Sequence, residues 1–287
     1  MTNVDQFESV SKSADKLTFS YRSIELKKVL VATDLDRGPA QQVVDRMRGF
    51  LTQLPNTQVS LEFKVLTDDS FNSVGELLNQ VEEYRPDLIV TYRNLKSDAW
   101  KWPFSLGEYL DVMLQALETP VLVLPRPGDG ASLPGRIKNT DRVMAMTDNL
   151  AGDDRIVNAA FAFTADRGSC WLTHIEDDTV FEHYMTAISK IPEIDTETAR
   201  VTIASRLQKG ARDYIQSCRT SAEEHGLGFS VEEVVGQGQH VPEYKRLVDD
   251  HNIDLLILYT RNDEHLAMHG VAYPLVIEMR DIPLLML

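Results

Sequence analysis

The chain contains little cysteine, with only Cys170 and Cys218 among its 287 residues. Two thiols cannot form a disulfide framework, and they cannot supply the ligands of a four-cysteine zinc site. The sequence therefore excludes the small, disulfide-stapled class of secreted proteins. We expect both cysteines to be buried, unreactive thiols in a protein of a reducing compartment.

Basic residues and long apolar runs are also scarce. Lysine and arginine number 29 against 44 aspartates and glutamates, which gives a net charge of -15 at pH 7. A chain this acidic repels polyanions, so we expect neither nucleic-acid binding nor anionic-membrane binding. No stretch approaches the roughly 18 apolar residues that span a bilayer, and residues 1–16 lack the basic and apolar regions of a signal peptide. We expect a cytoplasmic protein.

Apolar residues are plentiful, at 43% of the chain, and the length allows two compact domains. The segment Pro125–Gly135 contains three prolines and three glycines, which neither a helix nor a strand tolerates. An extra edge strand within Leu17–Leu26 is also expected. We therefore divide the chain into an N-terminal tail or edge strand, a first domain, a linker and a second domain, at 1–25, 26–124, 125–139 and 140–287.

The two halves repeat one pattern of strands. Each opens with an apolar run that ends in aspartate, Val29–Asp34 in the first half and Val143–Asp148 in the second. Each also has a later apolar run led by aspartate, at Asp87 and at Asp254. Such runs are typical of buried parallel strands, and apolar stripes with helical spacing lie between them. The alternation predicts an α/β fold with a parallel sheet.

The second half contains more elements than the first. It adds strands at Trp171–Ile175 and Phe229–Val235, on either side of a long helix with an apolar stripe from Ala199 to Cys218. The first half passes from its first helix directly to a strand at Val59–Leu66. We therefore expect the first half to lack one strand and one helix.

The end of each half gives the most specific signal. Gly107 precedes the strand that starts at Pro120 by thirteen residues, and Gly270 precedes Pro283 by the same spacing. Together with the strands that end in aspartate, this pattern resembles the universal stress protein family, as a tandem pair that covers almost all of residues 26–287. The resemblance implies two Rossmann-like (adenine nucleotide alpha-hydrolase-like) parallel-sheet domains in tandem, the first abbreviated.

Many members of that family dimerise through the last strand of the domain. For a tandem chain, the resemblance implies that Val121–Leu124 pairs with Leu284–Leu287 in an intramolecular pseudo-dimer, and the same strands could also serve a homodimer. Such pairing would cover an apolar strand edge, which is otherwise an aggregation hazard. Self-association through these strands is therefore the expected partner interaction, beside an unknown small ligand.

ATP-binding members of the family share the pattern G-x2-G-x9-G-[ST], in which backbone amides at a helix N-terminus hold the phosphates. In the first half the four positions hold Asn94, Ser97, Gly107 and Glu108. Glu108 places a carboxylate where a phosphate would sit. Ser105–Glu108 also has the spacing of a capping box, which would satisfy the first amides of the helix internally. We expect this half to have lost ATP binding.

The second half departs further from the ATP-binding pattern, so we expect both halves to have lost the ATP phosphate-binding loop. Its loop from Asn262 to Gly270 is five residues shorter than in the first half, and Val271 replaces the hydroxyl residue. Asp34 and Asp148 end the first strand of each half, where nucleotide-binding members have an aspartate that faces the ligand. Two readings of these aspartates stay open: residues that cap a turn, or retained ligand contacts.

All seven histidines lie in the second half. Four of them, His174, His240, His265 and His269, lie near the expected carboxyl ends of strands, where α/β proteins bind ligands. His265 and His269 have the spacing of a metal-binding pair on a helix, but Gly270 favours a loop there. We expect no metal site, and the four histidines are either surface residues or contacts to a small ligand.

The run Val29–Asp36 also resembles the D-x-D opening of haloacid dehalogenase-like phosphatases. That chemistry requires a lysine on the phosphate and a later acidic pair that holds Mg²⁺, and the residues after Val90 contain no such pair. We therefore expect a stress-response ligand- or partner-binding module with no enzymatic activity and no cofactor. The alternatives are a nucleotide-binding switch with one degenerate site for ATP or AMP, and a metal-dependent phosphotransfer enzyme.

Overall fold

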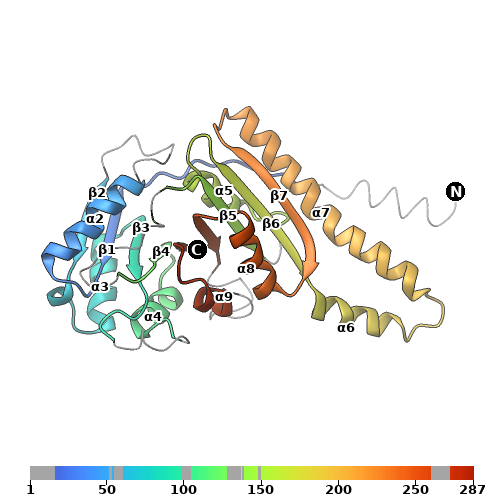
Figure 1. The fold of residues 1–287 in the computed structure, drawn as a ribbon, viewed down its shortest axis with the longest axis horizontal. Coiled ribbons are helices and arrows are strands. Elements are labelled where there is room, and N and C mark those ends of the chain that lie inside the picture. Colours follow the sequence, from blue (N-terminus) through green and yellow to red (C-terminus); the bar gives the residue numbers. More distant parts are fainter. Residues whose placement is uncertain are drawn as a thin grey trace.

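The computed structural model describes residues 17–51, 54, 61–97, 105–127, 137, 139–147, 150–259 and 272–287. These residues form one nine-stranded sheet flanked by helices (Figure 1). The strands are β1 (Lys28–Ala32), β2 (Glu62–Leu66), β3 (Leu88–Tyr92), β4 (Val121–Leu124), β5 (Arg142–Thr147), β6 (Ser169–Asp177), β7 (Ser230–Gly238), β8 (Leu255–Leu258) and β9 (Leu284–Met286). The helices are α2 (Arg37–Leu51), α3 (Val74–Tyr84), α4 (Glu108–Ala116), α5 (Asp154–Phe163), α6 (Asp178–Ile188), α7 (Thr196–Glu224), α8 (His240–Asp250) and α9 (Ala272–Glu278), with a short 3-10 helix, η1 (Asp68–Ser70).

The apolar stripes of the sequence become the packed faces of the helices. In α2, for example, apolar residues spaced three and four apart form one face that packs into the core. In α3, Ser73 is the N-cap and its side chain accepts a hydrogen bond from the Glu76 amide at 3.2 Å. Arg85 ends α3 in the left-handed conformation, with φ 52°. The buried residues of α2 are Ala40, Val43, Val44, Met47, Phe50 and Leu51.

The strand order is β2-β1-β3-β4-β9-β8-β5-β6-β7. Every neighbouring pair is parallel except β4 with β9. β1 lies between β2 and β3, and β5 lies between β6 and β8, so the first strand of each half occupies the same place in the order. Four strands lie on one side of the β4–β9 boundary and five on the other. The predicted α/β fold is confirmed.

β4 and β9 join the two parts of the sheet by antiparallel pairing. Leu122 lies opposite Leu285, and Val121 lies opposite Met286. These side chains are buried, with Leu122 and Leu285 fully inaccessible to solvent. β9 also pairs in parallel with β8 on its other side, so the apolar edges of both strands are covered.

Both cysteines lie in the core of the second part of the sheet. Cys170 is on β6 and Cys218 is on α7, and both are free, buried thiols. Burial raises the pKa of the Cys170 thiol to about 12, so the reactive thiolate is suppressed. The predicted burial of the cysteines is confirmed.

The segment before β1 docks on helices of the second half. The expected edge strand within Leu17–Leu26 is wrong, because these residues form no strand. Phe19 instead packs edge-on against Phe161 at 5.3 Å between ring centroids. The buried Asn158 side chain accepts a hydrogen bond from the Arg22 amide at 2.7 Å. Nothing in the local pattern marks this docking, since its partners lie more than a hundred residues away in sequence.

Replacing Asn158 with leucine is expected to lower the free energy of unfolding by about 2 kcal/mol, because two backbone groups lose their partner. Asn158 accepts from the Arg22 amide and also donates to the Ser20 carbonyl at 3.1 Å. Urea unfolding followed by circular dichroism measures the change. Asn158→Asp keeps the acceptor but buries a charge and turns a carboxylate oxygen toward the Ser20 carbonyl, so its stability should be no higher than that of the leucine variant. A leucine variant as stable as the wild type would contradict the assigned contacts.

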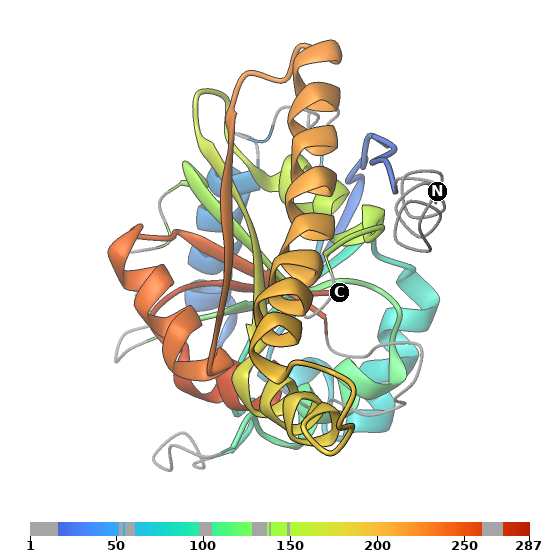
Figure 2. The ribbon, with the colours of Figure 1, turned by 90° about the vertical axis from the view of Figure 1, so that its right-hand side faces the viewer.

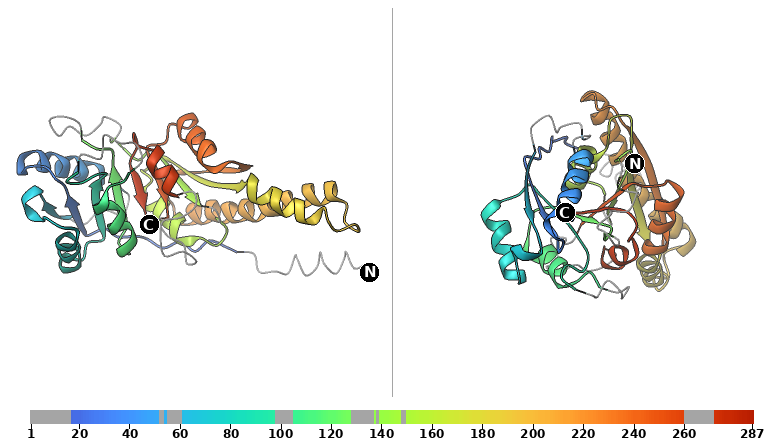
Figure 3. Two further views of the ribbon diagram at one scale, coloured as in Figure 1. Left: turned by 90° about the horizontal axis from the view of Figure 1, so that it is seen from below. Right: turned by 60° about the vertical axis from the view of Figure 1, so that its left-hand side comes forward.

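α6 and the first part of α7 extend beyond the sheet (Figures 1 and 3). The apolar stripe of α7 is continuous from Ala199 to Cys218 in sequence, but burial begins only at Ala211. From there α7 lies along β7, as Figure 2 shows. None of the helices in the described residues is both long and apolar enough to cross a bilayer.

Candidate functional site

Asp34, at the carboxyl end of β1, lies at the centre of a cluster of polar contacts. The Tyr92 hydroxyl donates a hydrogen bond to Asp34 Oδ1, and the Lys96 amide donates to Oδ2 at 2.8 Å. Arg126 Nη2 lies 3.4 Å from the same oxygen. The Asp34 side chain is only 11% exposed. Both carboxylate oxygens therefore already have partners within the protein.

Tyr92 and Arg126 support this carboxylate from two sides. Burial, followed by the hydrogen bond to Asp34, raises the pKa of the Tyr92 hydroxyl, so it remains a donor at neutral pH. The Arg126 guanidinium lies 5.3 Å from the centroid of the Tyr92 ring and donates to the carbonyls of Arg93 and Asn94. Arg126 thereby ties the chain after β4 to the loop after β3.

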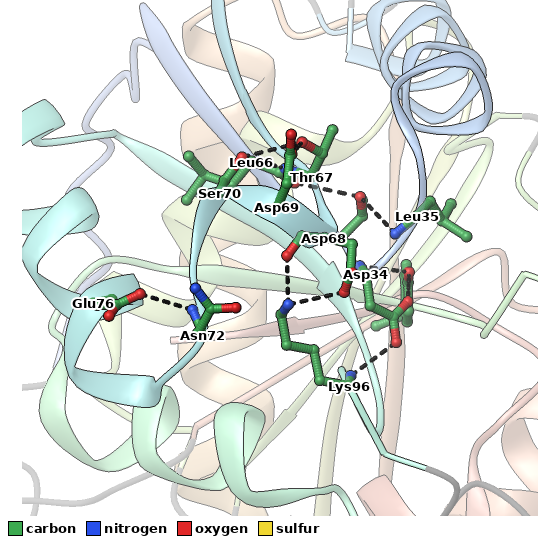
Figure 4. Close-up of polar contacts among 12 residues, drawn as sticks. Asp34, Leu35, Leu66, Thr67, Asp68, Asp69, Ser70, Asn72, Glu76 and Lys96 are labelled. Atoms are coloured by element: carbon green, nitrogen blue, oxygen red, sulfur yellow. Dashed lines mark hydrogen bonds and ion pairs between the residues drawn. The ribbon is translucent and has the colours of Figure 1, made fainter.

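Lys96 connects this cluster to the residues that follow β2 (Figure 4). Its Nζ atom donates to the carbonyl of Asp68 and lies 2.8 Å from Asp68 Oδ1. The ammonium group also lies 4.9 Å from the centroid of the Phe71 ring. The side chain of Lys96 is 16% exposed, so the cation is held between Asp68 and an aromatic face. The ends of β1, β2 and β3 are thus joined by one lysine.

In the described part of the loop from β3 to α4, several backbone amides donate hydrogen bonds within the protein. In an anion-binding loop these N–H groups would point at the ligand. Here each of four amides donates to a group of the protein itself. The pairs are Asn94 to Leu106 (2.7 Å), Lys96 to the Asp34 carboxylate (2.8 Å), Ser97 to Asn94 (3.3 Å) and Gly107 to the Ser105 hydroxyl (3.0 Å).

The start of α4 differs from the prediction. The helix begins at Glu108 with Gly107 as its N-cap, so the expected capping box over Ser105–Glu108 is wrong. The Ser105 hydroxyl accepts from the Gly107 amide instead, and the Glu108 side chain is exposed in the first turn. A carboxylate at that place still complements the positive end of the helix dipole.

Asn94 and Gly107 lie against each other, which explains the glycine. A Cβ atom on Gly107 would lie 2.7 Å from Asn94 Cα, and Gly107 has φ 87°. Asn94 itself is buried and left-handed, with φ 58°. Asparagine tolerates this conformation better than most residues, so it can stand where the family pattern has glycine. The structure therefore brings Asp34, Asn94, Ser97 and Gly107 into one loop region.

The second half contains a similar arrangement. Tyr259 follows Asp254 by the same five residues that separate Tyr92 from Asp87. Its hydroxyl donates to Asp153 Oδ1 at 2.6 Å, and the Arg155 guanidinium lies 5.6 Å from the ring centroid. Burial raises the pKa values of both the Tyr259 hydroxyl and the Asp153 carboxyl.

Asp153 has a structural role of its own in this arrangement. It is the N-cap of α5 and accepts a hydrogen bond from the Ile156 amide at 3.2 Å. Each half thus holds a tyrosine, a carboxylate and an arginine together at its strand ends.

His174 and His240 each contact residues at the carboxyl end of β6. His174 Nε2 lies 2.7 Å from Glu176 Oε1, and His240 Nε2 lies 2.6 Å from the Ile175 carbonyl oxygen. Asp177 Oδ2 lies 3.6 Å from His240 Nδ1. The two histidines are 5% and 8% exposed, so the expectation that they are surface residues is wrong. They are part of the packed end of the sheet.

Four of the candidate residues lie outside the described residues: Asp148, His265, His269 and Gly270. Among the residues that the structure describes, no group of three or more histidine, cysteine, aspartate or glutamate side chains is arranged to hold a metal ion. The cations beside Asp34 and Asp68 are side chains of the protein itself, namely Arg126 and Lys96.

The sequence interpretation missed Tyr92, Lys96 and Arg126. One signal was available for Tyr92, because a tyrosine stands five residues after the aspartate that leads the strand in each half, as Tyr259 does. Lys96 and Arg126 carry no such signal. Arg126 lies in the segment that we interpreted as linker, yet it contacts Asp34 across 92 residues.

No protein-family model matches the sequence, and a comparison with curated proteins finds no match. Among the solved structures that resemble the chain, two have a TM-score of 0.52. The functionally unknown protein PA1789 from Pseudomonas aeruginosa PAO1 is 14% identical, over 91% of this chain and 92% of its own, with a TM-score of 0.52. A protein from Pseudomonas aeruginosa UCBPP-PA14, described as a candidate universal stress protein, is 14% identical over 91% and 93%, also with a TM-score of 0.52. At this identity the similarity shows the fold alone, and that fold is universal stress protein-like.

Proposed function

We propose that this protein is a non-catalytic ligand- or partner-binding module of the universal stress protein type that does not bind ATP in its first half. One observation supports the proposal most: the Lys96 amide already donates a hydrogen bond to the Asp34 carboxylate, an anion of the protein itself. The stress-response role comes from the resemblance in sequence and fold. The proposal includes no cofactor and no nucleic-acid partner.

Electrostatics support the loss of nucleotide binding. A phosphate would have to displace Asp34 from the Lys96 amide, and a hydrogen bond to a charged group is worth about 1.5–3 kcal/mol. A phosphate that left Asp34 in place would sit near its negative charge, at a cost of about 3 kcal/mol for 5 Å and an effective dielectric of 20. Either route weakens ATP binding by about one to two orders of magnitude.

Calorimetric titration with ATP, ADP and AMP in the presence of Mg²⁺ tests the proposal. The wild type should show no saturable binding below about 100 μM. A Kd of that size corresponds to a binding free energy of roughly −5.5 kcal/mol. Asp34→Ala removes the internal anion and leaves Tyr92, Arg126 and the Lys96 amide facing one space, so it should gain measurable phosphate or ATP binding. Asp36→Ala is the matched control, because Asp36 is an exposed neighbour.

Two outcomes would overturn the proposal. Saturable micromolar binding by the wild type would favour the nucleotide-binding switch. Turnover of a generic phosphate ester with Mg²⁺ that is lost in Asp34→Asn would favour the phosphotransfer enzyme. In the latter case Asp34 would act as the nucleophile rather than as a partner of the loop amides.

A further inference from the structure

Residues 178–210, called the arm here, consist of α6, the following turn and the first part of α7. The arm projects beyond the sheet in two views of the molecule (Figures 1 and 3). Six of the seven large apolar residues that are exposed in the described part of the chain lie on it, and the other is Leu17. The six, with their exposed fractions, are Val180 (50%), Tyr184 (62%), Ile191 (43%), Ile194 (41%), Val201 (70%) and Leu207 (41%).

α6 has apolar residues on more than one face. Phe181 and Met185, one turn apart, are buried. Val180 and Tyr184, also one turn apart, form an adjacent stripe that faces solvent. An apolar stripe outside the packed face of a helix is typical of a helix that binds a further partner. Burying such a stripe against a partner is favourable, whereas its exposure to water is not.

The charge of the arm differs from that of the rest of the chain. Its five acidic and four basic residues give a net of −1, whereas the whole chain carries -15. The acidic body of a second copy repels the body of the first, but two arms can approach each other without that penalty. The arm is therefore the part of this surface best suited to contact another copy.

The charges of the second part of the arm, residues 193–210, are also ordered along its length. Three acidic residues lie at and just after the turn, namely Glu193, Asp195 and Glu197. Arg206 and Lys209 lie further along α7, toward the sheet. Two arms packed side by side in opposite directions would place the acidic turn of each on the basic stretch of the other. This contact is its own complement under a two-fold axis, which is the commonest symmetry of homodimers.

The size of the apolar surface fits a dimer. The exposed parts of the six residues correspond to roughly 600 Å² on each copy, or roughly 1,200 Å² for two, which is the lower bound of a stable interface before polar contacts are added. The edges of β4 and β9 are already paired with each other and with β3 and β8. A second copy must therefore use another surface.

We propose that the arm is a homodimerisation surface, on which a second copy of this chain packs its own arm antiparallel, so that two helical hairpins form a four-helix bundle. The apolar residues of α6 and α7 would form its centre. Glu193 of one copy would face Arg206 of the other, and the paired ends would fix the antiparallel direction.

Sedimentation velocity on the full chain at about 1–100 μM, the range expected for an interface of modest area, tests the proposal. The wild type should sediment as a dimer that dissociates on dilution. Val201→Glu and Tyr184→Glu should each raise the Kd about 100-fold or more, because a charge enters an apolar contact. Both residues are mostly exposed, so circular dichroism should show an unchanged fold. Asn79→Glu adds the same charge at an exposed position on α3, outside the arm, and is the control that should leave the Kd unchanged.

A charge exchange tests the antiparallel direction. Arg206→Glu and Glu193→Lys should each weaken the dimer, and the double variant should recover wild-type mass at the same concentration. A wild type that is monomeric throughout this range would overturn the proposal and leave the arm to a different protein or to another segment of the chain. A dimer that survives both Val201→Glu and Tyr184→Glu would overturn the arm as the interface.

Discussion

Replacing Leu285 with alanine should lower the free energy of unfolding by about 3 kcal/mol, one of the two largest effects that we expect. Leu285 is fully buried at the centre of β9. It lies opposite Leu122 on one side and Ile257 on the other, so its removal leaves a cavity where the two parts of the sheet meet. Urea unfolding followed by far-ultraviolet circular dichroism measures the loss.

A matched substitution at an exposed leucine separates the cavity from the change of residue type. Leu17 is 59% exposed, so Leu17→Ala should change the free energy of unfolding by less than about 1 kcal/mol. Equal losses at Leu285 and Leu17 would contradict the importance of the β4–β9 pairing. A larger loss at Leu285 locates the effect in the strand pair that connects the two parts of the sheet.

The second large effect is expected at Arg93, which follows β3. Its guanidinium donates from Nη2 to the carbonyls of Val276 and Met279, at the end of α9. Burial lowers the pKa of Arg93 to about 10, so the group is charged at neutral pH and held by these carbonyls. Arg93→Met leaves both carbonyls without this donor, and we expect a loss of about 3 kcal/mol.

Arg280 provides the comparison for Arg93. It donates from Nε to the Ile277 carbonyl at 2.9 Å, near the same helix end, but its side chain is exposed. Arg280→Met should therefore cost less than about 1 kcal/mol. Hydrogen exchange should show faster opening of α9 in Arg93→Met alone. Unchanged exchange in that variant would show that Arg93 does not hold α9.

The strands and most helices could be predicted because their apolar runs have a clear period. The runs at Val29–Asp34 and Val143–Asp148 became β1 and β5, at matching places in the strand order. The arm could not be predicted. The stripe from Ala199 to Cys218 shows that one face of the helix is apolar, but it does not show where the sheet beneath it ends.

The candidate site was predicted in part. The loop pattern identified Asn94, Ser97 and Gly107, and they lie in the loop whose Lys96 amide donates to Asp34. Arg126 could not be found, because a contact between residues so far apart leaves no local periodicity. The predicted capping box is wrong although the spacing of Ser105 and Glu108 fits one. Gly107, with a positive φ, is the N-cap, so the helix starts two residues later than a Ser105 cap implies.

The pairing of β4 with β9 also affects how the chain is made. Ribosomes deliver residues in order, and β4 leaves the ribosome long before β9 is synthesised. Until then the apolar edge of β4 has no partner in the sheet, although β1, β2 and β3 can already assemble beside it. A nascent chain that has not yet reached β9 therefore exposes an unpaired, aggregation-prone strand edge. We expect chaperones to bind mainly between the synthesis of β4 and the synthesis of β9.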